Sequence, residues 1–283
     1  MFITHSVYIK IPWGKSLKLI PFGDVHRDVA LCDVERWRGF LRRCRSEDDQ
    51  YTRYILMGDP CDFASYSERN ILKAASLHTT TRRRMDRLVK DTINGFVREI
   101  SFMRGKMLGV VAGNHNWEYA DGTTTDQQIA RLLDAKYLGD ISYIRITIET
   151  CGKRLNVDIV AAHGKAGGKT AGATINQVDD LRRIFPVADI YLCGHDHKRG
   201  VWPESTLIVN ANHKSGELEI KQKRQLLCRT GSFLRGYVDG ATSYVADRYL
   251  RPCELGTIRL EIKPKNEQHS YKQYYYPDIH ANV

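Results

Sequence analysis

The chain has 283 residues, of which 42% are hydrophobic, so it is long enough for one large domain or two small ones. Its formal net charge is +10, a basic surplus that favours polyanionic partners but says nothing about the fold. No apolar run reaches the ~18 residues of a membrane span, and the N-terminus lacks the basic-then-apolar pattern of a signal peptide. We therefore expect neither secretion nor membrane insertion.

The seven cysteines are irregularly spaced and include no Cys-x-x-Cys pair. An odd number without regular spacing fits reduced thiols better than a disulfide framework. The cysteines therefore predict a cytoplasmic protein, and none of them is expected to bind a metal.

Apolar runs and amphipathic segments alternate in the first half of the chain, and strands dominate the second half. In chain order, the predicted elements are an edge strand within 1–16, strands at 17–22, 54–57, 107–112, 141–150, 154–161, 190–193, 207–211 and 218–227, and helices at 33–45, 85–103 and 125–133. This order predicts an α/β start and an antiparallel second half. We expect a single domain over residues 1–262 and a basic, tyrosine-rich C-terminal tail over 263–283, which either stacks on bases or docks on the domain.

The crossover between the second and third core strands is basic. Residues 69–106 contain ten lysines and arginines against three acidic residues, a surplus of +7. Apolar residues at helical spacing predict an amphipathic helix with a basic outer face. Two interpretations stay open, a solubilising face or a face that follows phosphate groups.

Polar motifs follow five of the predicted strands. They are Gly23-Asp24-Val25-His26, Gly58-Asp59-Pro60-Cys61-Asp62, Gly113-Asn114-His115-Asn116, Ala162-His163-Gly164 and Gly194-His195-Asp196-His197. Asp24 and His26 are two residues apart, so in extended backbone both can reach one metal. Oxygen and imidazole ligands without thiolate are typical of a two-metal hydrolytic site.

These five motifs, in this order, resemble those of the calcineurin-like metallophosphoesterase superfamily over residues 23–197. One motif is weak, but five in order are specific. The resemblance implies an α/β fold in which two packed mixed β-sheets, a β-sandwich, are flanked by helices in four layers, α/β/β/α. The run 229–237 looks like that of phage- and prophage-borne members, which implies a host cytoplasm.

The resemblance also implies the metal ligands. One divalent ion would be held by Asp24, His26, Asp59 and His197, and the other by Asp59, Asn114, His163 and His195. The shared carboxylate shields two cations ~4 Å apart, and a metal-bridging hydroxide leaves a net charge of about +1, which suits a phosphate ester. Mn²⁺ is the first expectation, and Fe, Zn or Ni also suit these ligands.

By the same resemblance, His115 protonates the leaving oxygen or hydrogen-bonds the transition state. Many relatives have an acid after this histidine, whereas here Asn116 follows, so its strength as a general acid is open. Asp62 is expected to orient a ligand histidine. Arg27 either clamps a substrate phosphate or pairs with Asp28.

Residues 163–170 resemble a nucleotide-binding phosphate loop. His163 replaces the first glycine of that motif, and Gly172 is expected to interrupt any helix that follows, so ATP hydrolysis is not predicted. Lys165 and Lys169 either contact substrate from this loop or lie in solvent.

The preferred function is a phosphodiesterase that cleaves DNA or RNA, a nuclease. The basic crossover, five basic residues between 221 and 235, and the tail favour it. One alternative is a phosphomonoesterase or a small cyclic-nucleotide phosphodiesterase. Another is a metal-loaded module that binds nucleic acid with little turnover, against which the complete ligand set and His115 argue.

Overall fold

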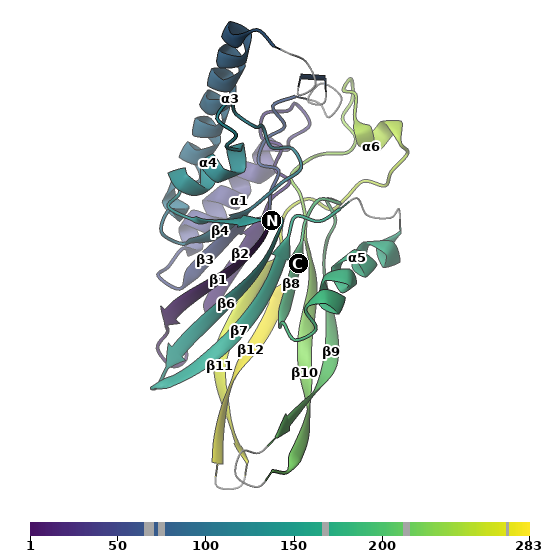
Figure 1. Ribbon diagram of the computed structural model, residues 1–283. Coiled ribbons are helices and arrows are strands. Elements are labelled where there is room, and N and C mark those ends of the chain that lie inside the picture. Colours follow the sequence, from purple (N-terminus) through teal and green to yellow (C-terminus); the bar gives the residue numbers. More distant parts are fainter. Residues whose placement is uncertain (65–70, 73–76, 166–169, 212–215, 270–271) are drawn as a thin grey trace.

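The computed structural model describes residues 1–64, 71–72, 77–165, 170–211, 216–269 and 272–283. It is a mixed α/β structure with two mixed sheets and few helices (Figure 1). The strands are β1 (Phe2–Lys10), β2 (Leu17–Phe22), β3 (Thr52–Leu56), β4 (Met107–Val111), β5 (Lys136–Gly139), β6 (Ile141–Thr150), β7 (Lys153–Ala162), β8 (Ile190–Cys193), β9 (Arg199–Ala211), β10 (Leu218–Thr230), β11 (Arg259–His269) and β12 (Lys272–Asn282). The helices are α1 (Val34–Glu47), α3 (Thr79–Glu99), the 3-10 turn η1 (Ser101–Met103), α4 (Thr125–Leu132), α5 (Ala171–Ile184) and α6 (Tyr244–Asp247).

Each sheet has six strands. Sheet A has the order β1-β6-β7-β8-β10-β9; β7, β8 and β10 are parallel, whereas β6–β7 and β9–β10 are antiparallel hairpins. Sheet B has the order β12-β11-β2-β3-β4-β5; β2 to β5 are parallel, and β11 and β12 are antiparallel. As predicted, β1 is an edge strand.

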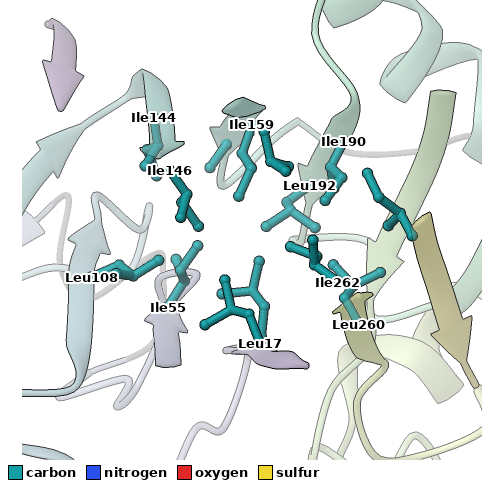
Figure 2. Close-up of a cluster of buried hydrophobic side chains, with 14 of the residues drawn as sticks. Leu17, Ile55, Leu108, Ile144, Ile146, Ile159, Ile190, Leu192, Leu260 and Ile262 are labelled. Carbon is teal, nitrogen blue, oxygen red and sulfur yellow. The ribbon is translucent and has the colours of Figure 1, made fainter. Parts of the chain in front are cut away.

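One hydrophobic core lies between the sheets. Every second residue of β6 is buried, so Ile144, Ile146 and Ile148 point to one face of sheet A. They belong to the same cluster as Leu17 and Ile55 of sheet B, and Figure 2 shows side chains of both sheets pointing into one space. Burying each such side chain contributes about 1.5–3 kcal/mol, which holds the two sheets together.

Helices pack on the outer faces. Phe22 of β2 contacts Trp37 of α1, whose ring stacks on Phe96 of α3 with centroids 5.9 Å apart. On sheet A, Val178 of α5 packs in one cluster with Tyr191 of β8. The helices therefore stiffen the sheets without covering the ends of the strands.

The ends of the parallel strands bring distant loops together. In each sheet, parallel neighbours end at the same edge, β2, β3 and β4 in one and β7 and β8 in the other. The edges of the two sheets meet, because His163 after β7 donates a hydrogen bond from Nδ1 to the carbonyl of Met57 after β3, at 2.7 Å. Ligands in α/β structures commonly bind at such carboxyl ends of strands.

The stretch 263–283 does not form a tail. Its described residues continue β11 and form β12, and β11 joins sheet B by pairing Leu260 and Ile262 with β2. Ile262 and Ile279 are buried in the core between the sheets. Inward and outward residues alternate over 260–264, whereas the described lysines and tyrosines that follow are partly or fully exposed, which is why the sequence resembled a tail.

A helix was also missed. α5 begins at Ala171, and the side chain of Thr170 accepts a hydrogen bond from the Ala173 amide at 3.3 Å. Gly172 lies in the first turn, where backbone N–H groups lack partners within the helix, so it does not interrupt the helix as expected. Within the described parts of the chain, no helix is long and apolar enough to cross a membrane.

Candidate metal centre

All seven predicted metal ligands lie in loops that directly follow strands. Asp24 and His26 follow β2, Asp59 follows β3, Asn114 follows β4, His163 follows β7, and His195 and His197 follow β8. The structure brings them together as two adjacent groups of converging side chains.

The first group is Asp24, His26 and His197, with ligand atoms within 4.8 Å of one another. Asp24 Oδ1 lies 4.0 Å from Nε2 of His26 and 3.6 Å from Nε2 of His197. Asp24 and His26 are buried, and neither Asp24 Oδ1 nor His26 Nε2 has a hydrogen-bond partner. Buried polar atoms without partners are costly, so a ligand between them is the simplest explanation.

The second group is Asp59, Asn114, His163 and His195. Nε2 of His163 lies 3.0 Å from Asp59 Oδ2, 2.8 Å from Asn114 Oδ1 and 3.2 Å from His195 Nδ1. Asn114 Oδ1 also lies 2.7 Å from His195 Nδ1. Four ligand atoms from four loops therefore converge on one small space.

The tautomer of His163 indicates that a positive charge is needed between these side chains. The carbonyl of Met57 can only accept a hydrogen bond, so Nδ1 of His163 carries a hydrogen. Nε2 then presents a lone pair to the oxygens of Asp59 and Asn114, which are also acceptors. Only a positive charge, a proton or a metal cation, can make these contacts favourable, and a hydrogen bond at the other nitrogen is the usual way to orient a ligand histidine.

Electrostatics agrees with a cation at this place. Burial opposes ionisation of Asp59, but the charge and hydrogen bond of His163 hold the pKa of its carboxyl below the ordinary value. Burial alone would lower the pKa of His163, yet Asp59 raises it to about 10. Burial and the charge of His163 lower the pKa of His195 to about 4, so His195 is neutral near pH 7 and its lone pair is free for a metal.

Five of the predicted ligands have left-handed backbone. The φ angles are 47° for Asp24, 47° for His26, 49° for Asp59, 70° for His195 and 61° for His197. Only four other described non-glycine residues have positive φ. This conformation costs energy in residues other than glycine and persists where the surroundings impose it, which is typical of functional sites.

Each of the two carboxylates divides its oxygens between the backbone and the centre. Asp24 Oδ2 accepts a hydrogen bond from the amide of His195 at 2.9 Å, and Asp59 Oδ1 accepts one from the amide of His115 at 2.9 Å. The other oxygen of each faces the histidines. The carboxylates therefore lock loops from different strands and still offer one oxygen to a cation.

Two glycines permit this approach of the loops. A Cβ on Gly113 would lie 2.2 Å from Asp59 Oδ1, and one on Gly58, at φ 96°, would lie 2.6 Å from His163 Nδ1. Both contacts are too short for any side chain. Glycine before Asp59 and before Asn114 is thus required by the close packing of the ligand loops.

Asp62 links two histidines. Its Oδ1 lies 3.1 Å from Nδ1 of His26 and in hydrogen-bond contact with Nδ1 of His115. Asn116 does not contact that imidazole; its amide donates to the carbonyl of Gly113 at 2.8 Å. The carboxylate that the residue after His115 does not supply comes instead from Asp62, and these bonds, despite burial, keep the pKa of Asp62 below its ordinary value.

The described residues predicted to contact substrate do not lie with the predicted ligands in these two groups. Arg27 forms an ion pair with Glu99 of α3 at 2.9 Å, so it neither pairs with Asp28 nor is free to clamp a phosphate. The Asp28 carboxylate accepts from the backbone amides of Asp62 and Phe63. Lys165 is exposed two residues after His163, and Lys169 lies outside the described residues.

Sequence reasoning missed the role of Arg229, which it counted among surface cations. Arg229 is fully buried and donates hydrogen bonds to the carbonyls of Gly194 at 2.7 Å and Thr174 at 2.8 Å. It also lies 3.5 Å from Asp196, between the two ligand histidines. Nor are Lys221 and Lys223 free, since they pair with Glu219 and Asp189.

The segment after Arg229 holds the Asp24 loop. The Asp24 carbonyl accepts hydrogen bonds from the Ser232 hydroxyl at 2.8 Å and the Phe233 amide at 3.0 Å.

A further buried acid, Asp126, accepts a hydrogen bond from the Gly113 amide at 2.9 Å, and burial raises its pKa to about 7. No local motif marks Asp126, and for Ser232 and Phe233 the resemblance of the run 229–237 to other sequences was the one indication.

Comparison with known proteins adds little. No protein-family model and no curated protein sequence matches the chain. Among solved structures, it is similar to the crystal structure of a conserved uncharacterized protein, a predicted phosphoesterase, from Streptococcus pneumoniae TIGR4. The two are 14% identical with a TM-score of 0.34, and the match covers 93% of this chain and 99% of that chain. A likeness at that score supports no conclusion, so the site rests on its own geometry.

Proposed function

We propose that the chain is a metal-dependent phosphoester hydrolase with two divalent cations between the loops after β2, β3, β4, β7 and β8. The observation that carries the proposal is that two of the converging atoms, Asp24 Oδ1 and His26 Nε2, are buried and have no hydrogen-bond partner. One cation would be held by Asp24, His26, Asp59 and His197, and the other by Asp59, Asn114, His163 and His195. Asp59 would then serve both.

Charge favours an anionic substrate. Two divalent cations carry +4 and the carboxylates of Asp24 and Asp59 carry −2, so the loaded centre has a surplus of +2. When bound, such cations stabilise negative charge on phosphoryl oxygens and lower the pKa of water toward ~7. A phosphate ester gains more from this surplus than a neutral ester or amide would.

His115 is the residue of the chain that we assign to proton transfer. Its Nδ1 is held by Asp62, and its Nε2 faces the centre, 3.8 Å from Asp59 Oδ2. Because the Asp62 carboxylate occupies Nδ1, Nε2 is the ring nitrogen that would pass a proton to the departing oxygen of the ester. Asp62 is thus a positioning residue, and it supplies the carboxylate partner that Asn116 does not.

We also propose that the sheets and helices form the four-layer α/β/β/α arrangement of metallophosphoesterases. The shared core between the sheets supports this, as do the separate clusters that join Phe22 to Trp37 and Tyr191 to Val178. The cation to supply first is Mn²⁺, with Fe, Zn and Ni as alternatives for these nitrogen and oxygen ligands.

Among phosphoesters, we favour the phosphodiesters of DNA or RNA, so that the enzyme is a nuclease. The exposed cations of α3 support this preference. In a phosphomonoesterase or a small cyclic-nucleotide phosphodiesterase, these cations would have no role in catalysis. In a nucleic-acid-binding module they would act without turnover.

The test is an assay of metal-stripped protein with Mn²⁺ restored, on single-stranded DNA, duplex DNA, bis-p-nitrophenyl phosphate and p-nitrophenyl phosphate. We expect cleavage of DNA and of the small diester, and a loss on the order of 10³-fold in the Asp59→Ala variant, because an ionised group aimed at the reacting centre is removed. Cleavage of the small esters alone would replace the nuclease by a small-molecule esterase. No turnover with metal bound would overturn the hydrolase proposal.

A further inference from the structure

The outer face of α3 carries a stripe of cations, defined here as Arg83, Arg87 and Lys90. They are spaced i, i+4 and i+7, so they share one face of the helix, and all three are exposed. Together with Asp86 they line a shallow hollow of about 320 Å³. The stripe is therefore a continuous feature of the surface.

The cations of the stripe form no close ion pair with a described carboxylate. No described carboxylate lies within 4.0 Å of the guanidinium groups of Arg83 and Arg87 or the Lys90 ammonium. Asp86 is committed elsewhere, because its carboxylate accepts from Trp117 Nε1 at 2.9 Å and from the Ala120 amide at 3.2 Å. The charge of Lys90 is partly offset by Asp121, and most of the positive charge of the stripe is therefore left for a partner.

The same contacts fix the stripe relative to the metal centre. Trp117 and Tyr119 are two and four residues beyond His115, both are buried, and both pack against Val89 of α3. Lys90 lies over the ring of Tyr119, with Nζ 5.3 Å from its centroid. The loop that carries Asn114 and His115 is thus docked directly beside the stripe.

The position of α3 suits a long substrate. Figure 1 shows α3 extending well past the ends of β2, β3 and β4, on one side of the loops that carry the ligands. Seven residues of helix, from Arg83 to Lys90, span about 10 Å. Along the axis of a duplex each strand rises 3.4 Å per phosphate, so that length corresponds to about three phosphate steps.

We infer that the cation stripe of α3 binds the sugar–phosphate backbone of a nucleic acid strand and directs it to the metal centre. The inference rests on the proposed function and names its substrate class and binding surface. Because the neighbouring aromatic rings are buried against α3 and do not offer a face to bases, recognition by the stripe is electrostatic and independent of base sequence.

The test compares two triple variants of the full chain. One changes the stripe, Arg83→Gln, Arg87→Gln and Lys90→Gln. The matched control changes Lys10, Lys153 and Arg154 to Gln. These exposed cations lie at the end of β1, beside Glu149 of β6, and at the start of β7, which is ten residues before His163, or about 33 Å along the strand. Binding of fluorescent single-stranded and duplex oligonucleotides is measured against salt in an Asp59→Ala background, and hydrolysis of bis-p-nitrophenyl phosphate in the otherwise unchanged chain.

We expect the stripe variant to lower the slope of log affinity against log salt by about 2, since each lost phosphate contact accounts for roughly 0.7 on a single strand. Affinity at 0.1 M salt then falls on the order of 100-fold, while small-diester hydrolysis and the control variant stay unchanged. Equal binding by both triple variants would overturn the inference. If the unchanged chain binds oligonucleotide through the stripe but hydrolyses no diester, the inference survives and the proposed function fails.

Discussion

The end of the sheets that carries the ligand loops and the end that carries the β9–β10 and β11–β12 hairpins differ in backbone conformation. β9 and β10 pair without interruption over thirteen residues each, and no described residue in these four strands has positive φ. At the other end, five of seven proposed ligands are left-handed. The irregular backbone is concentrated where side chains converge, and regular hydrogen bonding holds the rest.

The two ends also differ in what they bury. Asp24, Asp59 and His163 are almost inaccessible at the ligand end. On the β9–β10 hairpin, which projects at the bottom of Figure 1, Val209 and Ile220 are 61% and 67% exposed and face each other across the pair. Burial of polar side chains therefore lowers stability at the ligand end, whereas side chains at the hairpin end can be replaced with little loss of stability.

The largest effect is expected from a substitution that disrupts the close packing of the ligand loops. Gly113→Ala places a methyl group against the Asp59 carboxylate, which has to move. We expect activity on bis-p-nitrophenyl phosphate to fall by at least about 10²-fold, and stability by about 1–3 kcal/mol. Gly39→Ala in α1 is the control, since its nearest neighbour is the flexible Arg42 terminus at 3.8 Å, and it should gain about 0.5–1 kcal/mol. A fully active Gly113→Ala protein would contradict the packing argument.

Replacing Arg229 tests the ligand end in a second way, because the substitution should weaken metal binding. Arg229→Met leaves Asp196 without its buried counter-charge and two carbonyls without their donor, and we expect a loss of about 3–5 kcal/mol in the free energy of unfolding. The loop of His195 and His197 loosens, so Mn²⁺ affinity measured by calorimetry should fall about 10- to 100-fold. Arg229→Lys should recover part of both losses. Unchanged Mn²⁺ affinity in a folded Arg229→Met protein would show that the buried cation supports stability alone.

The smallest effect is expected at the hairpin end. Ile220→Lys replaces an exposed side chain with no described role, so the free energy of unfolding should change by no more than about 0.5 kcal/mol. Diester hydrolysis should also be unchanged. Thermal unfolding and the bis-p-nitrophenyl phosphate assay check both, and a marked loss of either would show that this exposed face has a role in the folded protein.

Much of the fold could be predicted because local periodicity is strong. β2 and β8 begin and end as predicted, and β6 and β7 lie over the strands predicted at 141–150 and 154–161. α5 and the β11–β12 hairpin were not predicted, since a glycine in a first turn and a charged, aromatic strand contradict simple propensities. Tertiary packing overrides such local preferences.

The sequence by itself determined which residue types stand at the strand ends, and the order of Asp24, Asp59, Asn114, His163 and His195 was enough to indicate a metal centre. The tertiary structure alone decided the partners: Glu99 for Arg27, Asp62 for His115, and the carbonyls of Gly194 and Thr174 for Arg229. These pairs lie 35 to 72 residues apart in the chain. Spacing in a strand or helix reports only near neighbours, whereas burial forces every distant polar group to find a partner where the fold brings one.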